Sequence, residues 1–310
     1  MGEEFVRFSL APLLIGVLAA MACALPGNFL LLRRQAMIGD AISHVVLPGI
    51  VVAFLLTGSV TTWPMMLGAL GAAALSAVLI ELVRRFGRVE PGAAMGVVFT
   101  TLFALGVLML ERANLGRAHL DVQHALYGNL ESLMWLRSSG WSSLLDPQAL
   151  ARLPEELPRM AGVAGLMGLL TLVFWRPLKI ASFDEGFARS LGIPVRGVSF
   201  GIVLAAAAAC VAAFDAVGSI IVIAMLVCPP ATARLMTDRL STQVWLSLGF
   251  AAFAATAGYV LAGYGPIWLG GEHAVSAAGM IATVAGLTLG IAALCGPHRR
   301  RDEAGESQPL

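Results

Sequence analysis

The chain has 310 residues, of which 58% are hydrophobic and only 13% are charged, and its formal net charge is +1. This composition, with a mean hydropathy of +0.83, excludes an ordinary soluble domain and indicates a polytopic membrane protein. The near-neutral charge gives no indication of a nucleic-acid partner.

Nine apolar runs are long enough to cross roughly 30 Å of hydrocarbon as helices. They cover residues 10–32, 41–56, 65–83, 93–110, 160–175, 198–214, 216–236, 245–262 and 274–295. A broken or re-entrant arrangement at Asp215, where two runs meet, would leave eight spans. The N-terminus lacks a basic leader and a small-residue cleavage site, so we expect a retained first span. We predict an all-α membrane protein with one transmembrane domain over residues 1–298 and a cytoplasmic tail over 299–310.

Most of the basic residues lie in alternate loops between these runs. Because Lys and Arg accumulate in short cytoplasmic loops, these loops are predicted to be cytoplasmic. The residues are Arg33, Arg34, Arg84, Arg85, Arg88, Arg176, Lys179, Arg189, Arg196, Arg234, Arg239, Arg299, Arg300 and Arg301. With nine spans, this places the N-terminus outside and the C-terminus in the cytoplasm. Residues 111–159 then form a long outward segment.

The second run carries an acid and an imidazole, in the sequence GDAISHVVLPG over residues 39–49. A carboxylate at the centre of a spanning helix costs roughly 2.5–3.5 kcal/mol, so such residues usually face a bundle interior or a water-filled path. Asp40 and His44 are four residues apart, so in a helix they share one face and can converge on a small cation. Pro48 lacks an N–H, which leaves the carbonyl of His44 free and predicts a kink beyond it. The alternative is that Asp40 caps the helix and His44 is a polar core residue.

Two outward segments contain further residues that can bind a metal. His119, Asp121 and His124 lie in the long outward segment, and Glu272 and His273 precede the last apolar run. Such groups at the mouth of a path could attract a cation without a fixed coordination geometry. The alternative is that they are exposed polar residues of the kind that loops routinely carry.

A polar stretch, SFDEGFARSLGIP over residues 182–194, interrupts the apolar runs in a predicted cytoplasmic loop. Its pattern suits a short amphipathic helix that ends at Gly192 and Pro194. The residues of this helix are Asp184, Glu185, Phe187, Ala188 and Arg189. Without other information, the stretch could equally be a solvated loop between helices.

Several motifs are absent from the sequence. There is no G-x-x-x-x-G-K-[ST] phosphate loop and no H-E-x-x-H zinc-protease motif. The four cysteines, Cys23, Cys210, Cys228 and Cys295, lie in apolar runs without disulfide or metal spacing, so we expect small buried side chains.

Four ordered segments resemble the permeases of ATP-binding-cassette (ABC) importers for manganese, zinc and iron. They are residues 39–49, the block AMGVVFTTLFALGVLML from Ala94, residues 182–194, and AVGSIIVIAMLVCPPATARLMTDRL from Ala216. Gly128 and Asn129 match a further Gly-Asn pair of that family. The segment 138–158, Asp215 and the GGEHAV stretch near Gly270 depart from its pattern.

The resemblance implies a type II, BtuC-like permease in the bacterial inner membrane, with Asp40 and His44 as metal ligands. It also implies that Asp184, Glu185, Phe187, Ala188 and Gly192 belong to a coupling helix that docks on a separate ATPase subunit. The chain would be non-catalytic, with no permanent cofactor and Mn²⁺, Zn²⁺ or Fe²⁺ as its cargo. An external metal-binding protein and a second permease copy or paralogue would complete the transporter.

Two other functions remain open from the sequence. A secondary transporter driven by an ion gradient could use Asp40, His44 and Asp215 as a proton relay. An ABC permease for a siderophore or cobalamin would share the architecture but would not need a compact Asp and His pair.

Overall fold

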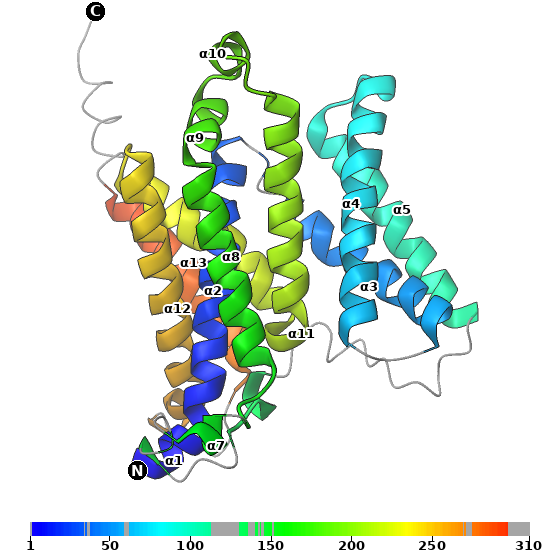
Figure 1. The fold of residues 1–310 in the computed structure, drawn as a ribbon. Coiled ribbons are helices and arrows are strands. Elements are labelled where there is room, and N and C mark those ends of the chain that lie inside the picture. The colour runs from blue at the N-terminus through cyan, green and yellow to red at the C-terminus, as the bar shows by residue number, and fades with distance from the viewer. Residues whose placement is uncertain are drawn as a thin grey trace, which may run out of the picture.

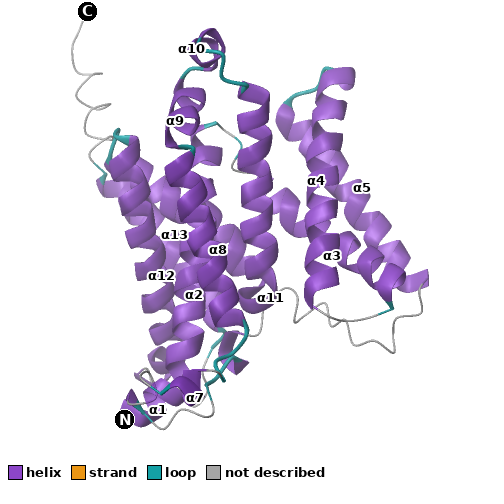
Figure 2. Cartoon of the chain, in the orientation of Figure 1, coloured by secondary structure: helices purple, strands orange, loops and turns teal. Residues whose placement is uncertain are grey.

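The structure is a computed structural model, and it describes residues 2–33, 35, 38–58, 62–112, 130–135, 140–141, 143, 146–150, 152–268, 270 and 275–296. Every regular element within these ranges is helical (Figure 2). The N-terminal part comprises α1 (Gly2–Phe5), a π-helical turn (Val6–Leu10), α2 (Ala11–Leu32), α3 (Ile38–Thr57), α4 (Thr62–Gly87) and α5 (Pro91–Arg112). A 3-10 turn (Leu130–Ser132), α7 (Pro147–Leu150), α8 (Glu156–Val173), α9 (Trp175–Phe183) and α10 (Glu185–Ser190) follow. The C-terminal part comprises α11 (Val195–Met236), α12 (Leu240–Trp268) and α13 (Ala277–Cys295).

The described residues contain eight helices that are long and apolar enough to cross a membrane. A shorter apolar helical stretch, His44–Thr57, lies within α3. Together these elements match the nine predicted runs, and they confirm the all-α polytopic fold. The start of the chain and the end of α13 lie at opposite ends of the bundle, and α10 is at the same end as the end of α13 (Figure 1). Which end faces the cytoplasm stays a prediction.

Helix α11 contains two predicted spans. Its 42 residues would extend roughly 63 Å as a straight helix, about twice the thickness of the hydrocarbon core. The helix is broken at Gly218, whose φ of 78° and ψ of 168° are non-helical. Glycine adopts this conformation without the steric cost that a Cβ would add. The two predicted runs meet at Asp215, three residues before this break, and the stretches Val195–Phe214 and Ala216–Met236 both qualify as spans.

The core of the bundle is built around α2, which packs against α8, α11 and α12. The backbone of α2 approaches α11 very closely at Gly27, where a Cβ would collide with the carbonyl oxygen of Leu226. Pro230, four residues after Leu226, has no N–H to bond that carbonyl, so its oxygen is free to face Gly27. A proline at position 230 is therefore compatible with the close approach of α2 and α11 at Gly27.

A buried polar network links α2 to α12. The Nδ2 of Asn28 donates to the Oγ of Ser247 over 2.7 Å, and the Nε2 of Gln243 donates to the Oδ1 of Asn28 over 3.1 Å. All three side chains are fully buried. Because unsatisfied polar groups are costly in an apolar bundle, this network ties α12 to α2 in one register.

Helices α3, α4 and α5 pack together beside the first part of α11 (Figure 1). Small residues allow close approach of α3 and α4, since a Cβ on Gly49 would lie 2.5 Å from the carbonyl oxygen of Gly68. The group thus carries the GDAISHVVLPG segment at the side of the core.

The cysteine prediction was partly wrong. Cys23 and Cys210 are buried, and Cys228 is half-buried. Cys295 is exposed, because it is the last residue of α13.

Candidate functional site

The GDAISHVVLPG segment forms the first half of α3. Asp40 is the third residue of this helix, and His44 follows one turn later. Asp40 thus lies within the first turn of the helix, and both interpretations of its side chain, as metal ligand and as cap, stay open. The backbone places both residues on one face, as their spacing predicts. The structure describes only the backbone of Asp40, so whether its carboxylate meets the imidazole stays a prediction.

The imidazole of His44 packs against two aromatic rings of α5. It is stacked on Phe99, with centroids 5.3 Å apart and planes at 18°, and it meets Phe103 edge-on at 5.6 Å and 78°. Two rings in these orientations restrict the plane of the imidazole, which pre-orients its nitrogens. Phe99 and Phe103 are not among the site residues predicted from the sequence. Their spacing of four residues on one predicted helix was the available signal.

Pro48 lies one turn beyond His44 and is buried within a helix that continues past it. On α5, a Cβ at Gly106 would lie 2.8 Å from the Cβ of Pro48. The absence of a side chain at Gly106 therefore lets α5 approach α3 closely beside the candidate site. The predicted kink stays a prediction.

The turn that carries Asp40 and His44 adjoins a polar cleft of about 460 Å³. Ala41 and Ile42 line this cleft from α3, next to Asp40. Its charged lining comprises Arg33, Glu81, Arg84, Glu185, Arg189 and Arg196. The start of α3 and the polar segment over residues 182–194 therefore share one water-accessible space.

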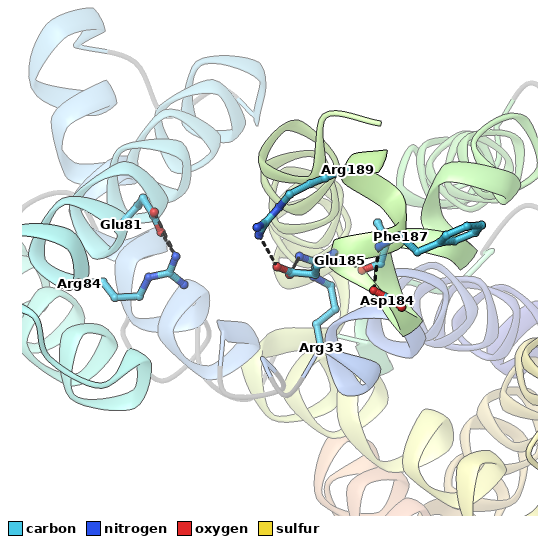
Figure 3. Close-up of polar contacts among 8 residues, drawn as sticks. Arg33, Glu81, Arg84, Asp184, Glu185, Phe187 and Arg189 are labelled. Atoms are coloured by element: carbon cyan, nitrogen blue, oxygen red, sulfur yellow. Dashed lines mark hydrogen bonds and ion pairs between the residues drawn. The ribbon is translucent and has the colours of Figure 1, made fainter. Parts of the chain in front are cut away.

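The polar segment forms α10, a helix of six residues whose ends are well defined (Figure 3). The Oδ1 of Asp184 accepts from the backbone N–H of Phe187 over 2.9 Å, which caps the helix start. At the other end, Gly192 has a φ of +75°, and the N–H of Ile193 bonds the carbonyl of Ala188 over 3.0 Å. This is the left-handed glycine termination that the sequence predicts.

The two faces of α10 differ in burial. Ala188 is fully buried against Ala181 and Val195, so it anchors α10 to the helices on either side. Phe187 is 55% exposed. An exposed aromatic side chain on a rigid, capped helix is typical of a docking surface.

An ion pair ties α10 to the end of α2 (Figure 3). The Nη2 of Arg33 lies 2.8 Å from the Oε1 of Glu185, and its Nη1 donates to the carbonyl of Ala181 over 3.1 Å. The Arg33 side chain is only 7% exposed, and burial lowers the pKa of its guanidinium while the charge of Glu185 opposes that change. The Oε2 of Glu185 also accepts from Arg189 over 3.1 Å. From the sequence, Arg33 indicates only the topology. Its contact with Glu185 joins residues 152 positions apart and leaves no local pattern.

The remaining predicted residues are not brought into this site. His119, Asp121, His124, Glu272 and His273 all lie outside the described residues. The structure describes the backbone of Asp215, within α11, but not its side chain. In the part of the chain that is described, no group of three or more His, Cys, Asp or Glu side chains could hold a metal ion.

The sequence matches the ABC 3 transport family over residues 6–135 and 139–293. It is 40% identical over 282 residues to the manganese transport system membrane protein MntD of Bacillus subtilis, covering 91% of this chain and 90% of that protein. It is 36% identical over 286 residues to the zinc transport system membrane protein TroD of Treponema pallidum, covering 92% of this chain and 73% of that one.

Solved structures show the same fold. The chain superposes on PsaBC from Streptococcus pneumoniae, in complex with Fab, with a TM-score of 0.75 and 26% identity, over 96% of this chain and 95% of the other. An inward-facing conformation of a putative metal-chelate type ABC transporter gives a TM-score of 0.63 at 14% identity, covering 94% and 88% of the two chains, and supports the fold alone. Sequence, fold and helix content thus agree, and the chain belongs to the ABC 3 transport family as a multi-span membrane permease.

Proposed function

We propose that this chain is the permease subunit of an ABC importer that carries a divalent transition metal, Mn²⁺, Zn²⁺ or Fe²⁺, into a bacterial cytoplasm. The observation that carries the proposal is the placement of Asp40 and His44 one turn apart in α3. Ala41 and Ile42, in the same turn, line a polar cleft. The similarity to membrane proteins named for manganese and zinc transport supports the same cargo class.

The ion would be cargo that binds transiently. A carboxylate and an imidazole are suitable ligands for all three metals, so the pair alone does not select among them. Two copies related by a two-fold axis would supply four side chains, enough to surround one ion. Phe99 and Phe103 would hold each imidazole in a fixed plane, which favours rapid capture without reorganisation.

We infer that α10 is the docking element for a separate ATPase subunit. Its cap, its buried Ala188 and its exposed Phe187 make it a rigid projection between two membrane-spanning segments. A rigid element can transmit nucleotide-driven motion because it moves with the helices that anchor it. Arg33 would pass that motion to the end of α2, five residues before α3 begins.

The test is metal uptake by the transporter reconstituted with its ATPase and its external binding protein. Asp40→Ala and His44→Ala should each abolish ATP-dependent uptake of manganese and zinc while assembly is kept. Thr100→Ala on α5 is the control, since among the described residues that hydroxyl donates to the carbonyls of Gly96 and Val97 in its own helix. Normal uptake by both site variants would exclude these ligands.

The same preparation distinguishes the two alternative functions. Uptake that follows a proton gradient without ATP would indicate a secondary transporter. Uptake of a chelate that excess free metal does not inhibit would indicate a siderophore or cobalamin permease.

A further inference from the structure

The polar cleft beside the start of α3 has two charged walls that face one another (Figure 3). Glu81 and Arg84 line it from α4, and Glu185 and Arg189 line it from α10. Helix α4 packs against α3, which carries the candidate metal ligands. The cleft therefore separates the segment that we assign to the ATPase from the helices that hold the candidate metal site.

Each wall contains an ion pair of its own. The Nη2 of Arg84 lies 2.9 Å from the Oε2 of Glu81, and the Nη2 of Arg189 lies 3.1 Å from the Oε2 of Glu185. All four side chains are exposed, by 42–69%. Such exposed pairs between neighbouring residues of one helix contribute little to stability, because water competes for both charges. Either pair can therefore be exchanged for another at little cost.

The wall on α10 can release Arg189 without leaving a carboxylate unpaired. The Oε1 of Glu185 lies 2.8 Å from the Nη2 of Arg33, whose side chain is only 7% exposed. Arg189 contacts the other oxygen, Oε2, and its own side chain is 69% exposed. Glu185 thus stays fixed by Arg33 while its Oε2 accepts a different guanidinium.

The two walls have complementary charges. Each presents one carboxylate and one guanidinium to the same water-accessible space (Figure 3). If α10 moved toward α4, Arg189 would meet Glu81. Arg84 would then meet Glu185, so two pairs within the walls would become two pairs between them, and no charge would lose its partner. Water would leave the closing cleft, and the lower local dielectric would strengthen the new pairs.

We propose that the cleft closes by this exchange of ion pairs, and that Glu81 and Arg84 thereby couple α10 to the helices of the candidate metal site. The inference rests on the proposed docking of an ATPase at α10. Glu81 and Arg84 are positioning residues in this scheme, since they act through α3 and need not touch the ion. Helices α3 and α4 move together because Gly49 and Gly68 bring their backbones into contact.

Crosslinking measures the approach of the two walls in the assembled transporter. Glu81→Cys is combined with Arg189→Cys and with Cys295→Ser, which removes the exposed native thiol. Copper phenanthroline then oxidises the two new thiols to a disulfide when they meet. We expect the disulfide to form at least about five-fold faster with ATP and vanadate than without nucleotide. Arg85→Cys in place of Glu81→Cys is the control, since Arg85 is exposed on α4 but is not among the residues that line the cleft, and nucleotide should not change its rate.

Charge reversal tests whether the pairing matters for transport. Glu81→Arg alone should reduce ATP-dependent metal uptake at least about five-fold, because it places like charges across the closing cleft. Arg189→Glu alone should do the same, and the two changes together should restore uptake to within about two-fold of the parent. Arg85→Glu, the matched reversal outside the cleft, should leave uptake unchanged.

Co-purification of the ATPase and its rate of ATP hydrolysis are measured for each variant. In Glu81→Arg both should be retained while uptake falls, which separates a loss of coupling from a loss of docking. Either of two results would overturn the inference: crosslinking that nucleotide does not accelerate, or a double reversal that transports no better than its single variants. A parent transporter without ATP-dependent uptake would refute the proposed function, and this inference with it. A parent that transports while either test fails would refute only the exchange of ion pairs.

Discussion

Replacing Glu185 by Gln should loosen α10 from the end of α2 without unfolding the permease. The ion pair between Arg33 and Glu185 joins a guanidinium that is 7% exposed to a carboxylate that is 51% exposed, over 2.8 Å. Exposed pairs contribute about 0–1 kcal/mol, whereas removing one member of a buried pair costs about 3–5 kcal/mol. Because solvent reaches only the glutamate, we expect Glu185→Gln to lower the free energy of local opening by about 1–2 kcal/mol. This corresponds to a factor of about 5–30 in the local opening equilibrium.

Hydrogen exchange of residues 184–193 in nanodiscs measures this opening directly. The amides of Ala188 and Ile193 are the reporters, since they bond the carbonyls of Asp184 and Ala188 over 3.0 Å each. Their protection factors should fall about 5–30-fold in Glu185→Gln.

A control and a double-mutant cycle isolate the contact. Arg189 also meets Glu185, but it is 69% exposed, so Arg189→Gln should cost about 0.3–0.5 kcal/mol, or roughly two-fold in protection. Combining Glu185→Gln with Arg33→Met measures the coupling between the two side chains. A coupling below about 0.5 kcal/mol would show that the ion pair does not hold α10 in place.

Three further variants test other parts of the account. Phe187→Asp should uncouple ATP hydrolysis from uptake, because the exposed ring is lost while the backbone N–H of residue 187 still supports the helix cap. Full uptake with metal-stimulated hydrolysis would refute this. Gly49→Val should lower the free energy of unfolding by about 1–3 kcal/mol because α4 leaves no room for a side chain, whereas Gly71→Val, in open space, should not. Neutralising Asp121 and Glu272 together should reduce metal uptake at low ionic strength and less in high salt; unchanged uptake in low salt would make them an ordinary solvated surface.

The sequence alone determined the features that depend on local pattern. Apolar runs of sufficient length correspond to the membrane helices of the structure, because each spanning segment must satisfy its own backbone hydrogen bonds. Helical spacing put Asp40 and His44 on one face, and the cap and the glycine end of α10 followed from Asp184 and Gly192. The boundary between the two runs of α11 was placed at Asp215, three residues before the non-helical Gly218.

Only the tertiary structure decided which distant groups meet. The aromatic rings around His44 come from α5, and the partner of Glu185 comes from the end of α2, 152 residues earlier. An apolar groove that α2, α8, α9 and α11 line likewise depends on helices from both halves of the chain. Such contacts leave no periodic pattern in the sequence. They depend on close packing between helices, which the spacing of residues within one helix does not reveal.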